Sequence, residues 1–229
     1  DPEAFIKRHT GGERTFLFDA VVDGRNLFRV GRIGDGGKWL ADPQSLPAKP
    51  VLYSFGVGDD ISFDTAMAGQ FGYEVHLFDP SAPVVAGFKK FKQASPCGKG
   101  SISYHPVGLG PCSDDPKSQW DLVIDGVKCE VKGLAALAKE LGNARVDVLK
   151  VDIEGGELTA LPPALAEGTF EALGVKQLLV EIHLWDDGQF RRYVKFIGDL
   201  KKHGYEMFRK EFNPGDSARC AEFAFVKVR

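Results

Sequence analysis

This sequence of 229 residues has few cysteines and no long apolar run, and each absence excludes a class of protein. The four cysteines (Cys97, Cys112, Cys129 and Cys220) are too few and too dispersed for a disulfide-stabilised fold, and none forms a Cys-x-x-Cys zinc motif. Their pairing stays open. No apolar run approaches the ~20 residues that cross a bilayer, and the first residues lack the pattern of a signal peptide. We expect a water-soluble chain, and the compartment stays open between the secretory pathway and the cytoplasm.

The sequence also lacks a large excess of charge of one sign. Its formal net charge is -3, so nothing in the overall balance favours a nucleic acid as partner. Lys89, Lys90 and Lys92 form a local basic cluster, which we interpret as the solvated face of a helix. With 43% hydrophobic and 27% charged residues, the composition is that of an ordinary globular protein. No linker divides the chain, so we expect one domain over residues 1–229, in an oligomeric state that the sequence does not specify.

Apolar, β-branched runs alternate with helical patterns along the chain, which is typical of a parallel sheet with helices on both faces. The runs predict strands at 51–55, 74–78, 101–107, 146–153 and 175–184, and a closing antiparallel pair at 205–212 and 220–228. Helices are predicted from about Ser62, over 83–92, 134–141 and 156–161, and after 184, where Tyr193, Phe196, Ile197 and Leu200 have helical spacing. Asp125-Gly126 predicts a tight hairpin outside the main sheet. The fold class is therefore α/β, with a Rossmann-like, mostly parallel, seven-stranded sheet.

The first two predicted strands end in residues suited to a nucleoside-containing cofactor. Phe55, Gly56 and Gly58 end the first strand, and glycines at this spacing let the backbone approach a ligand closely. Asp79 ends the second strand, near the offset at which an acid binds a ribose diol. Pro80 and Phe78 could flank an adenine. Gly108, after the third strand, completes the expected cofactor site.

The helix that follows these glycines argues against a dinucleotide. Ile61 stands where a dinucleotide fold usually has its third glycine. Asp59 and Asp60 begin the helix, where they would repel a pyrophosphate but attract the sulfonium and ammonium of S-adenosylmethionine. Alternatively, the two aspartates simply cap the helix.

The later strands end in candidate catalytic groups. Asp152, Glu154 and Glu157 follow the fourth strand, and Glu181 and His183 lie on one face of the next because they are two residues apart. His183 or Asp152 could act as the base that takes a proton from a hydroxyl acceptor. Alternatively, His183 is a hydrogen-bonded core residue, or Asp152, Glu181 and His183 hold Mg²⁺ or Mn²⁺.

A glycine-rich turn precedes the first predicted strand of the sheet. It contains Asp35, Gly36 and Gly37, with Arg29 and Arg32 before them. This turn is either an ordinary surface turn or a lid over the methionine end of the cofactor, with arginines that pair with acids at the site.

The motifs RVGRIGDGG, YSFGVGDDISFD, EVHLFDPS, DVLKVDIEGGE, LLVEIH and CAEFAFV together resemble the methyltransferase-like protein 24 group, which is related to the FkbM methyltransferases. The resemblance spans nearly the whole chain from Arg29 and implies a class I methyltransferase fold. Within the single domain expected over 1–229, we predict that residues 1–48 form an N-terminal segment whose glycine-rich turn packs on the cofactor site. The resemblance implies that Gly56, Gly58 and Asp79 bind S-adenosylmethionine and that Asp152 and Glu154 line the mouth. It also implies O-methylation of a small-molecule or carbohydrate acceptor.

Two other functions compete with this interpretation. An NAD(P)-dependent oxidoreductase would use a similar sheet, but the missing third glycine and the closing antiparallel pair disfavour it. A non-catalytic module that binds S-adenosylmethionine would keep the fold without turnover. A cofactor-binding assay distinguishes an oxidoreductase from a methyltransferase, and a turnover assay distinguishes a non-catalytic module from a methyltransferase.

Overall fold

The computed structural model describes residues 20, 25–33, 36–42, 46–88, 95–111, 122–213, 216 and 219–228, and they are organised around one eight-stranded sheet. In spatial order the strands are β13 (Tyr205–Phe212), β14 (Cys220–Lys227), β12 (Gln177–His183), β11 (Val148–Val151), β3 (Val51–Phe55), β4 (Glu74–Phe78), β6 (Gly100–His105) and β5 (Ser95–Cys97). The central strands are parallel, whereas β14 runs antiparallel to both of its neighbours. The strand order reverses between β3 and β11, which is where ligands bind in sheets of this kind.

The seven predicted strands, which include the closing antiparallel pair, are confirmed, and β5 adds an eighth strand at one edge. The strand predicted over 101–107 ends at His105, because Pro106 has no N–H to donate to the ladder. Gly108–Leu109 instead forms a separate short strand, β7, which pairs with β10 (Val131–Lys132). The strand predicted over 146–153 is shorter, at Val148–Val151.

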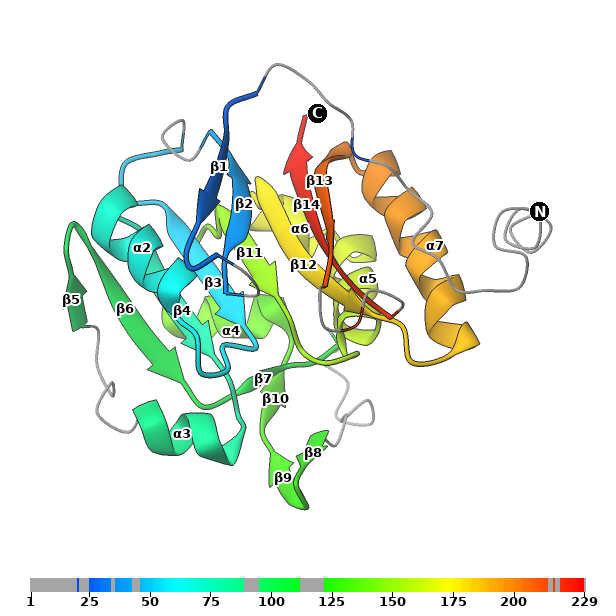
Figure 1. Ribbon diagram of the computed structural model, residues 1–229, viewed down its shortest axis with the longest axis horizontal. Helices are drawn as coiled ribbons and strands as arrows, with labels where there is room; N and C mark the ends of the chain where they lie inside the picture. Colours follow the sequence, from blue (N-terminus) through cyan, green and yellow to red (C-terminus); the bar gives the residue numbers. More distant parts are fainter. Residues whose placement is uncertain are drawn as a thin grey trace.

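Helices cover one face of the sheet (Figure 1). They are α4 (Leu134–Leu141), α5 (Glu157–Ala166), α6 (Thr169–Ala172) and α7 (Asp187–Lys202). The predicted apolar stripe of α7 is buried, as expected. The helix predicted to end at Leu161 continues through Pro162 and Pro163 to Ala166. Burial of Ala164 and Leu165 in the core offsets the hydrogen bonds that two prolines remove.

The opposite face is covered by α2 (Ser62–Phe71) and by a hairpin of β1 (Leu27–Val30) and β2 (Lys38–Ala41) (Figure 1). The sequence did not predict this hairpin. Gln177 of β12 fastens it to the sheet, because its Oε1 accepts from Ala41 N (3.0 Å) and its Nε2 donates to Ala41 O (2.6 Å). Both bonds are buried, so the hairpin is an integral layer of the fold rather than a surface turn.

Two smaller elements lie beside the sheet. The predicted hairpin is confirmed as β8 (Leu122–Ile124) and β9 (Val127–Cys129), with positive φ at both turn residues, although Trp120 and Asp121 lie outside the described residues. The helix α3 (Ala82–Phe88) begins close to its predicted start, and Lys89, Lys90 and Lys92 also lie outside the described residues.

Two further observations on the described part of the chain concern membrane-spanning helices and cysteines. Within it, no helix is both long enough and apolar enough to cross a membrane. Cys97, Cys129 and Cys220 are free thiols, and Cys112 lies outside the described residues.

Candidate functional site

A cavity of about 750 Å³ opens at the carboxyl ends of β3, β4 and β11, next to the point where the strand order reverses. We call it the strand-end cavity. Its size falls within the range of small-molecule sites in proteins. It brings together most of the residues that the sequence singled out for the cofactor: Gly36, Phe55, Gly56, Gly58, Asp79, Pro80, Gly108 and Asp152.

The two glycines after β3 have different reasons to be glycine. Gly56 has φ +70°, and a Cβ there would lie 1.4 Å from the carbonyl oxygen of Asp152, so the turn can only close with glycine. Gly58 has φ +57°, and a Cβ there would meet nothing within 4 Å. Since Gly58 lines the strand-end cavity, its missing side chain keeps that space open to a ligand.

Asp79 closes this turn from the end of β4. Its Oδ2 accepts hydrogen bonds from the backbone N–H groups of Val57 and Gly58, both at 3.1 Å. Its Oδ1 accepts from the N–H and the hydroxyl of Ser81, at 2.9 and 2.6 Å. The carboxylate, predicted to bind a ribose, therefore first holds the glycine turn in shape.

The start of α2 is occupied by an acid. Asp60 Oδ1 accepts from the N–H of Ser62, the first residue of the helix, and Asp60 Oδ2 lies 3.5 Å from Arg32. The backbone hydrogen bond from Ser62 holds the pKa of Asp60 below its usual range. A carboxylate at this end of the helix stands where a dinucleotide fold would place a pyrophosphate.

Part of the lining of the strand-end cavity is apolar. Pro80, Leu109, Leu122 and Ile124 line it, the last two from the β8–β9 hairpin. Phe78, which the sequence placed beside an adenine, stacks on Phe55 in the core with ring centroids 4.3 Å apart. Both rings also line the strand-end cavity.

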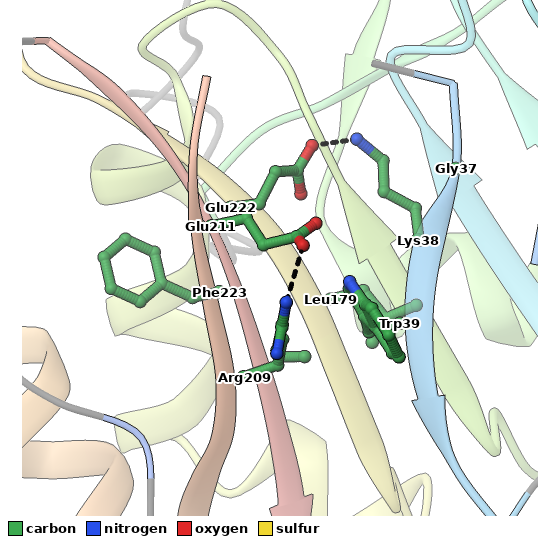
Figure 2. A pocket seen from close by; sticks show the side chains of 9 residues that line it. Gly37, Lys38, Trp39, Leu179, Arg209, Glu211, Glu222 and Phe223 are labelled. Atoms are coloured by element: carbon green, nitrogen blue, oxygen red, sulfur yellow. Dashed lines mark hydrogen bonds and ion pairs between the residues drawn. The ribbon is translucent and has the colours of Figure 1, made fainter. Parts of the chain in front are cut away.

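Residues of the N-terminal turn divide between two cavities. Arg32 and Gly36 line the strand-end cavity, as the lid hypothesis requires, whereas Gly37 lines a separate cavity of about 10 Å³. Figure 2 shows this second cavity, where Arg209 stacks on Trp39 and pairs with Glu211. Asp35 lies outside the described residues.

A buried ion cluster lies between β2 and the sheet. Lys38 reaches from β2 to bond Glu222 of β14 (Figure 2). Its Nζ also lies 3.6 Å from Asp152 Oδ2. Burial would lower the pKa of Lys38, but the charges of Glu222 and Asp152 outweigh it and raise that pKa. Burial would raise the pKa of Asp152, but the positive charges of Lys150, Lys38 and His183 outweigh this effect and hold that pKa below its usual range. The cluster thus keeps Asp152 ionised where it lines the strand-end cavity.

Glu181 and His183 lie behind Asp152 and do not line this cavity. Burial and the charges of Asp152 and Glu222 raise the pKa of Glu181 to about 7, although its Oε1 accepts from Asn213 Nδ2 at 2.7 Å. A carboxyl with this pKa can take up or release a proton near neutral pH.

His183, unlike Glu181, keeps its proton at neutral pH. Its Nδ1 lies 3.0 Å from Glu157 Oε1, and its Nε2 lies 3.5 Å from Glu154 Oε2. Burial would lower the pKa of His183, but the hydrogen bond and charge of Glu157 raise it to about 9. An imidazole with this pKa is already protonated at neutral pH, which argues against the predicted role of general base. Glu157, expected at the mouth, is instead fully buried and binds the N–H groups of Ile153 and Gly155.

A family model described as a methyltransferase domain matches residues 20–227 of the chain. The chain belongs to this family. Human and rat proteins described as "Probable methyltransferase-like protein 24" are 29% and 30% identical to it over 167 residues, which confirms the resemblance seen in the motifs. These alignments cover 69% and 70% of the chain, which spans 41% of the length of each relative.

Solved structures with a similar fold include an rRNA methylase from Streptococcus thermophilus, with 10% identity and a TM-score of 0.47, which covers 82% of this chain and 92% of that one. Another is the magnesium protoporphyrin IX methyltransferase from Synechocystis PCC 6803 with bound S-adenosylmethionine, with 15% identity and a TM-score of 0.42. That alignment covers 80% of this chain and 72% of the other.

The predicted Mg²⁺ or Mn²⁺ site gains no support in this methyltransferase domain. In the described residues, Asp152, Glu181 and His183 do not all approach one another closely enough to share an ion. Asp152 and Glu181 do form a compact set of oxygen donors with Glu222, but the ammonium of Lys38 already binds that set. A cation of the protein's own therefore neutralises the position that a hard metal ion would need.

Sequence reasoning missed three polar residues of this domain, which are Lys38, Asn213 and Glu222, and it missed the burial of Glu157. Glu222 is a single acid inside the apolar strand CAEFAFV, and a lone charge on a buried strand face indicates a partner. No comparable pattern surrounds Lys38, because the residues next to it do not show that its side chain packs against the sheet.

Proposed function

We propose that this methyltransferase domain binds S-adenosylmethionine in the strand-end cavity and transfers its methyl group to a hydroxyl. The observation that carries the proposal is the turn at Gly56 and Gly58, which leaves open space bordered by acids. When bound, S-adenosylmethionine supplies an electrophilic methyl group on a positively charged sulfur. Asp59, Asp60 and Asp152 lie around this space. Acidic residues outnumber basic ones in its lining, although Lys38 and Lys150 also lie there, and this balance favours a cationic ligand.

The remaining walls suit the adenosine part of the cofactor. Pro80, Leu109, Leu122 and Ile124 offer an apolar surface to a base. All four acceptor positions of Asp79 are filled within the chain, so a ribose hydroxyl would take the place of the Ser81 hydroxyl on Oδ1. This exchange keeps the glycine turn intact, because Val57 and Gly58 bind the other oxygen.

Asp152 and Glu181 support an acceptor with a hydroxyl group. Asp152 lines the strand-end cavity in ionised form and can accept the hydrogen of that hydroxyl. Glu181 hydrogen-bonds to Asp152 and, with a pKa of about 7, can hold the released proton. The choice of a small molecule or carbohydrate as acceptor rests on the resemblance described above.

Calorimetric titration tests the cofactor. The chain is titrated with S-adenosylmethionine and S-adenosylhomocysteine, with NAD and NADP as controls, each with and without Mg²⁺ or Mn²⁺. Micromolar binding of the first pair alone, independent of metal, is the expected result. Binding of a dinucleotide, or of none of the four, would refute the proposal.

Turnover tests the distinction from a non-catalytic module. Release of S-adenosylhomocysteine is measured against a panel of hydroxyl acceptors that begins with sugars. Asp152→Asn is expected to lose turnover even at saturating S-adenosylmethionine, because an amide cannot take the proton. Equal turnover in both proteins would remove Asp152 from this role.

A further inference from the structure

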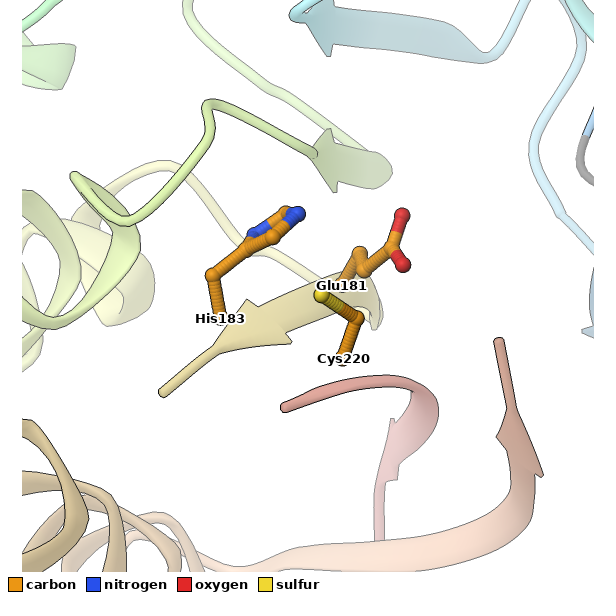
Figure 3. Close-up of side chains that lie close together, drawn as sticks. All are labelled: Glu181, His183 and Cys220. Atoms are coloured by element: carbon orange, nitrogen blue, oxygen red, sulfur yellow. The ribbon is translucent and has the colours of Figure 1, made fainter. Parts of the chain in front are cut away.

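We propose that Glu181, His183 and Cys220 form a binding site for a transition metal ion of the zinc type, beside the strand-end cavity. One donor atom from each side chain lies within 4.8 Å of the other two, and all three residues are buried. Figure 3 shows the three side chains together, two from β12 and one from the start of β14. They provide one oxygen, one nitrogen and one sulfur donor.

The backbone fixes this arrangement. His183 and Cys220 are direct partners in the antiparallel ladder between β12 and β14, so their side chains lie next to each other on one face. Glu181 lies two residues before His183 and shares that face. Donors carried by neighbouring strands keep their spacing better than donors carried by loops.

A buried carboxylate orients the histidine as metal-binding histidines are commonly oriented. Glu157 Oε1 lies 3.0 Å from His183 Nδ1, and Glu157 is itself held by the N–H groups of Ile153 and Gly155. Nδ1 donates its hydrogen to Glu157, so a metal ion that displaces the Nε2 proton of His183 finds the lone pair of a neutral imidazole there. This contact assigns the imidazole a tautomer suited to coordination.

The donor set selects the class of metal. Thiolate and imidazole suit zinc and similar ions, whereas Mg²⁺ and Ca²⁺ take oxygen ligands. Zinc ligands lie about 2.0 to 2.3 Å from the ion and hence within about 4 Å of one another, so small side-chain movements close the site. Glu154 Oε2 lies 3.5 Å from His183 Nε2, and its side chain is 80% exposed, so a carboxylate at the surface stands next to the nitrogen donor.

Metal binding stands independently of the proposed function, since it requires neither S-adenosylmethionine nor an acceptor. While an ion occupies the Glu181 carboxylate, this group holds no proton for methyl transfer. The metal-bound and proton-accepting states therefore exclude each other.

Cobalt titration of the chelator-treated full chain tests the site. One equivalent of Co²⁺ is expected to produce a thiolate-to-cobalt charge-transfer band, which Zn²⁺ then abolishes by displacement. Cys220→Ser should remove the band and weaken Zn²⁺ binding by about 100-fold or more. Glu157→Gln should keep the band but weaken binding about 10- to 100-fold, because the imidazole loses its charged partner. Cys129→Ser and Cys112→Ser are matched thiol controls and should change neither.

Absence of the band, its survival in Cys220→Ser, or its loss in either control would overturn the proposal. Circular dichroism shows whether each variant is folded. Should Cys220→Ser fail to fold, Glu157→Gln decides the matter, because an unchanged affinity for Co²⁺ in that variant contradicts coordination by His183.

Discussion

Replacing Lys38 by methionine tests whether one buried ammonium holds the partly buried carboxylates of Asp152 and Glu222 together. The Lys38 side chain is 5% exposed, bonds Glu222 and lies 3.6 Å from Asp152. Methionine keeps much of the length but leaves both acids without their cation. Removing one partner of a buried ion pair costs about 3–5 kcal/mol. For a domain of this size, we expect the melting temperature to fall by roughly 6–20 °C.

The loss of stability should depend on pH in a defined direction. Burial already raises the pKa of Glu222 in the folded chain, and removing the ammonium raises the pKa values of both Glu222 and Asp152. The folded variant then binds more protons than the unfolded one, so its stability is greatest below the unfolded pKa and is lost as the pH rises through the folded pKa. The deficit of Lys38→Met relative to the unchanged chain should therefore shrink as the pH falls.

Urea unfolding followed by circular dichroism, at mildly acidic and mildly basic pH, measures this deficit. Lys195→Met is the matched control, because Lys195 is 77% exposed and pairs with Asp199 on the surface of α7. Its loss should cost about 1 kcal/mol or less. The double variant Lys38→Met/Glu222→Gln should recover part of the lost stability. A Lys38→Met deficit no larger than that of the control, or the same at both pH values, would refute the reasoning.

In the metal-free chain, methyl transfer should accelerate as the pH rises through about 7, where the Glu181 carboxyl loses its proton, and Glu181→Gln should flatten this pH profile. Asp79→Ala should weaken S-adenosylmethionine binding by about 10- to 100-fold in calorimetry, and an unchanged affinity would exclude its role. Gly56→Ala should destabilise the fold by about 3 kcal/mol or more, because its Cβ meets a carbonyl oxygen, whereas Gly58→Ala should cost about 1 kcal/mol and mainly reduce cofactor affinity. His183 should titrate by NMR near pH 9, and its contribution to stability should be lost as the pH rises through that value; titration near 6.5 would contradict the pairing with Glu157.

Much of the fold and the outline of the cavity could be predicted from the sequence. The strands Val51–Phe55, Glu74–Phe78 and Tyr205–Phe212 have the predicted bounds, because a buried strand needs a short apolar run ended by turn residues. Parallel strands end at one edge of a sheet, so Gly58 and Asp79 could be placed together without coordinates. Both line the strand-end cavity.

The β1–β2 hairpin could not be predicted in the same way. Its strands are four residues each, too short to show a clear period of two, and its place is set by Gln177, more than a hundred residues later. Nothing in the residues around Lys38 therefore indicates that its ammonium is buried. Only packing of the hairpin on the sheet buries this ammonium and brings it to Glu222 and Asp152.

The spacing along the chain was enough to place Glu181 and His183 on one strand face, after a strand that ends in acids. Their protonation could not be predicted in this way, because it depends on contacts that form only in the folded chain. Glu181 lies among the carboxylates of Asp152 and Glu222, so its pKa rises toward neutrality, whereas His183 contacts Glu157 and stays charged. The physical reason is that a pKa depends on burial and on charges a few ångströms away. Here those charges come from strands and helices that are distant along the chain.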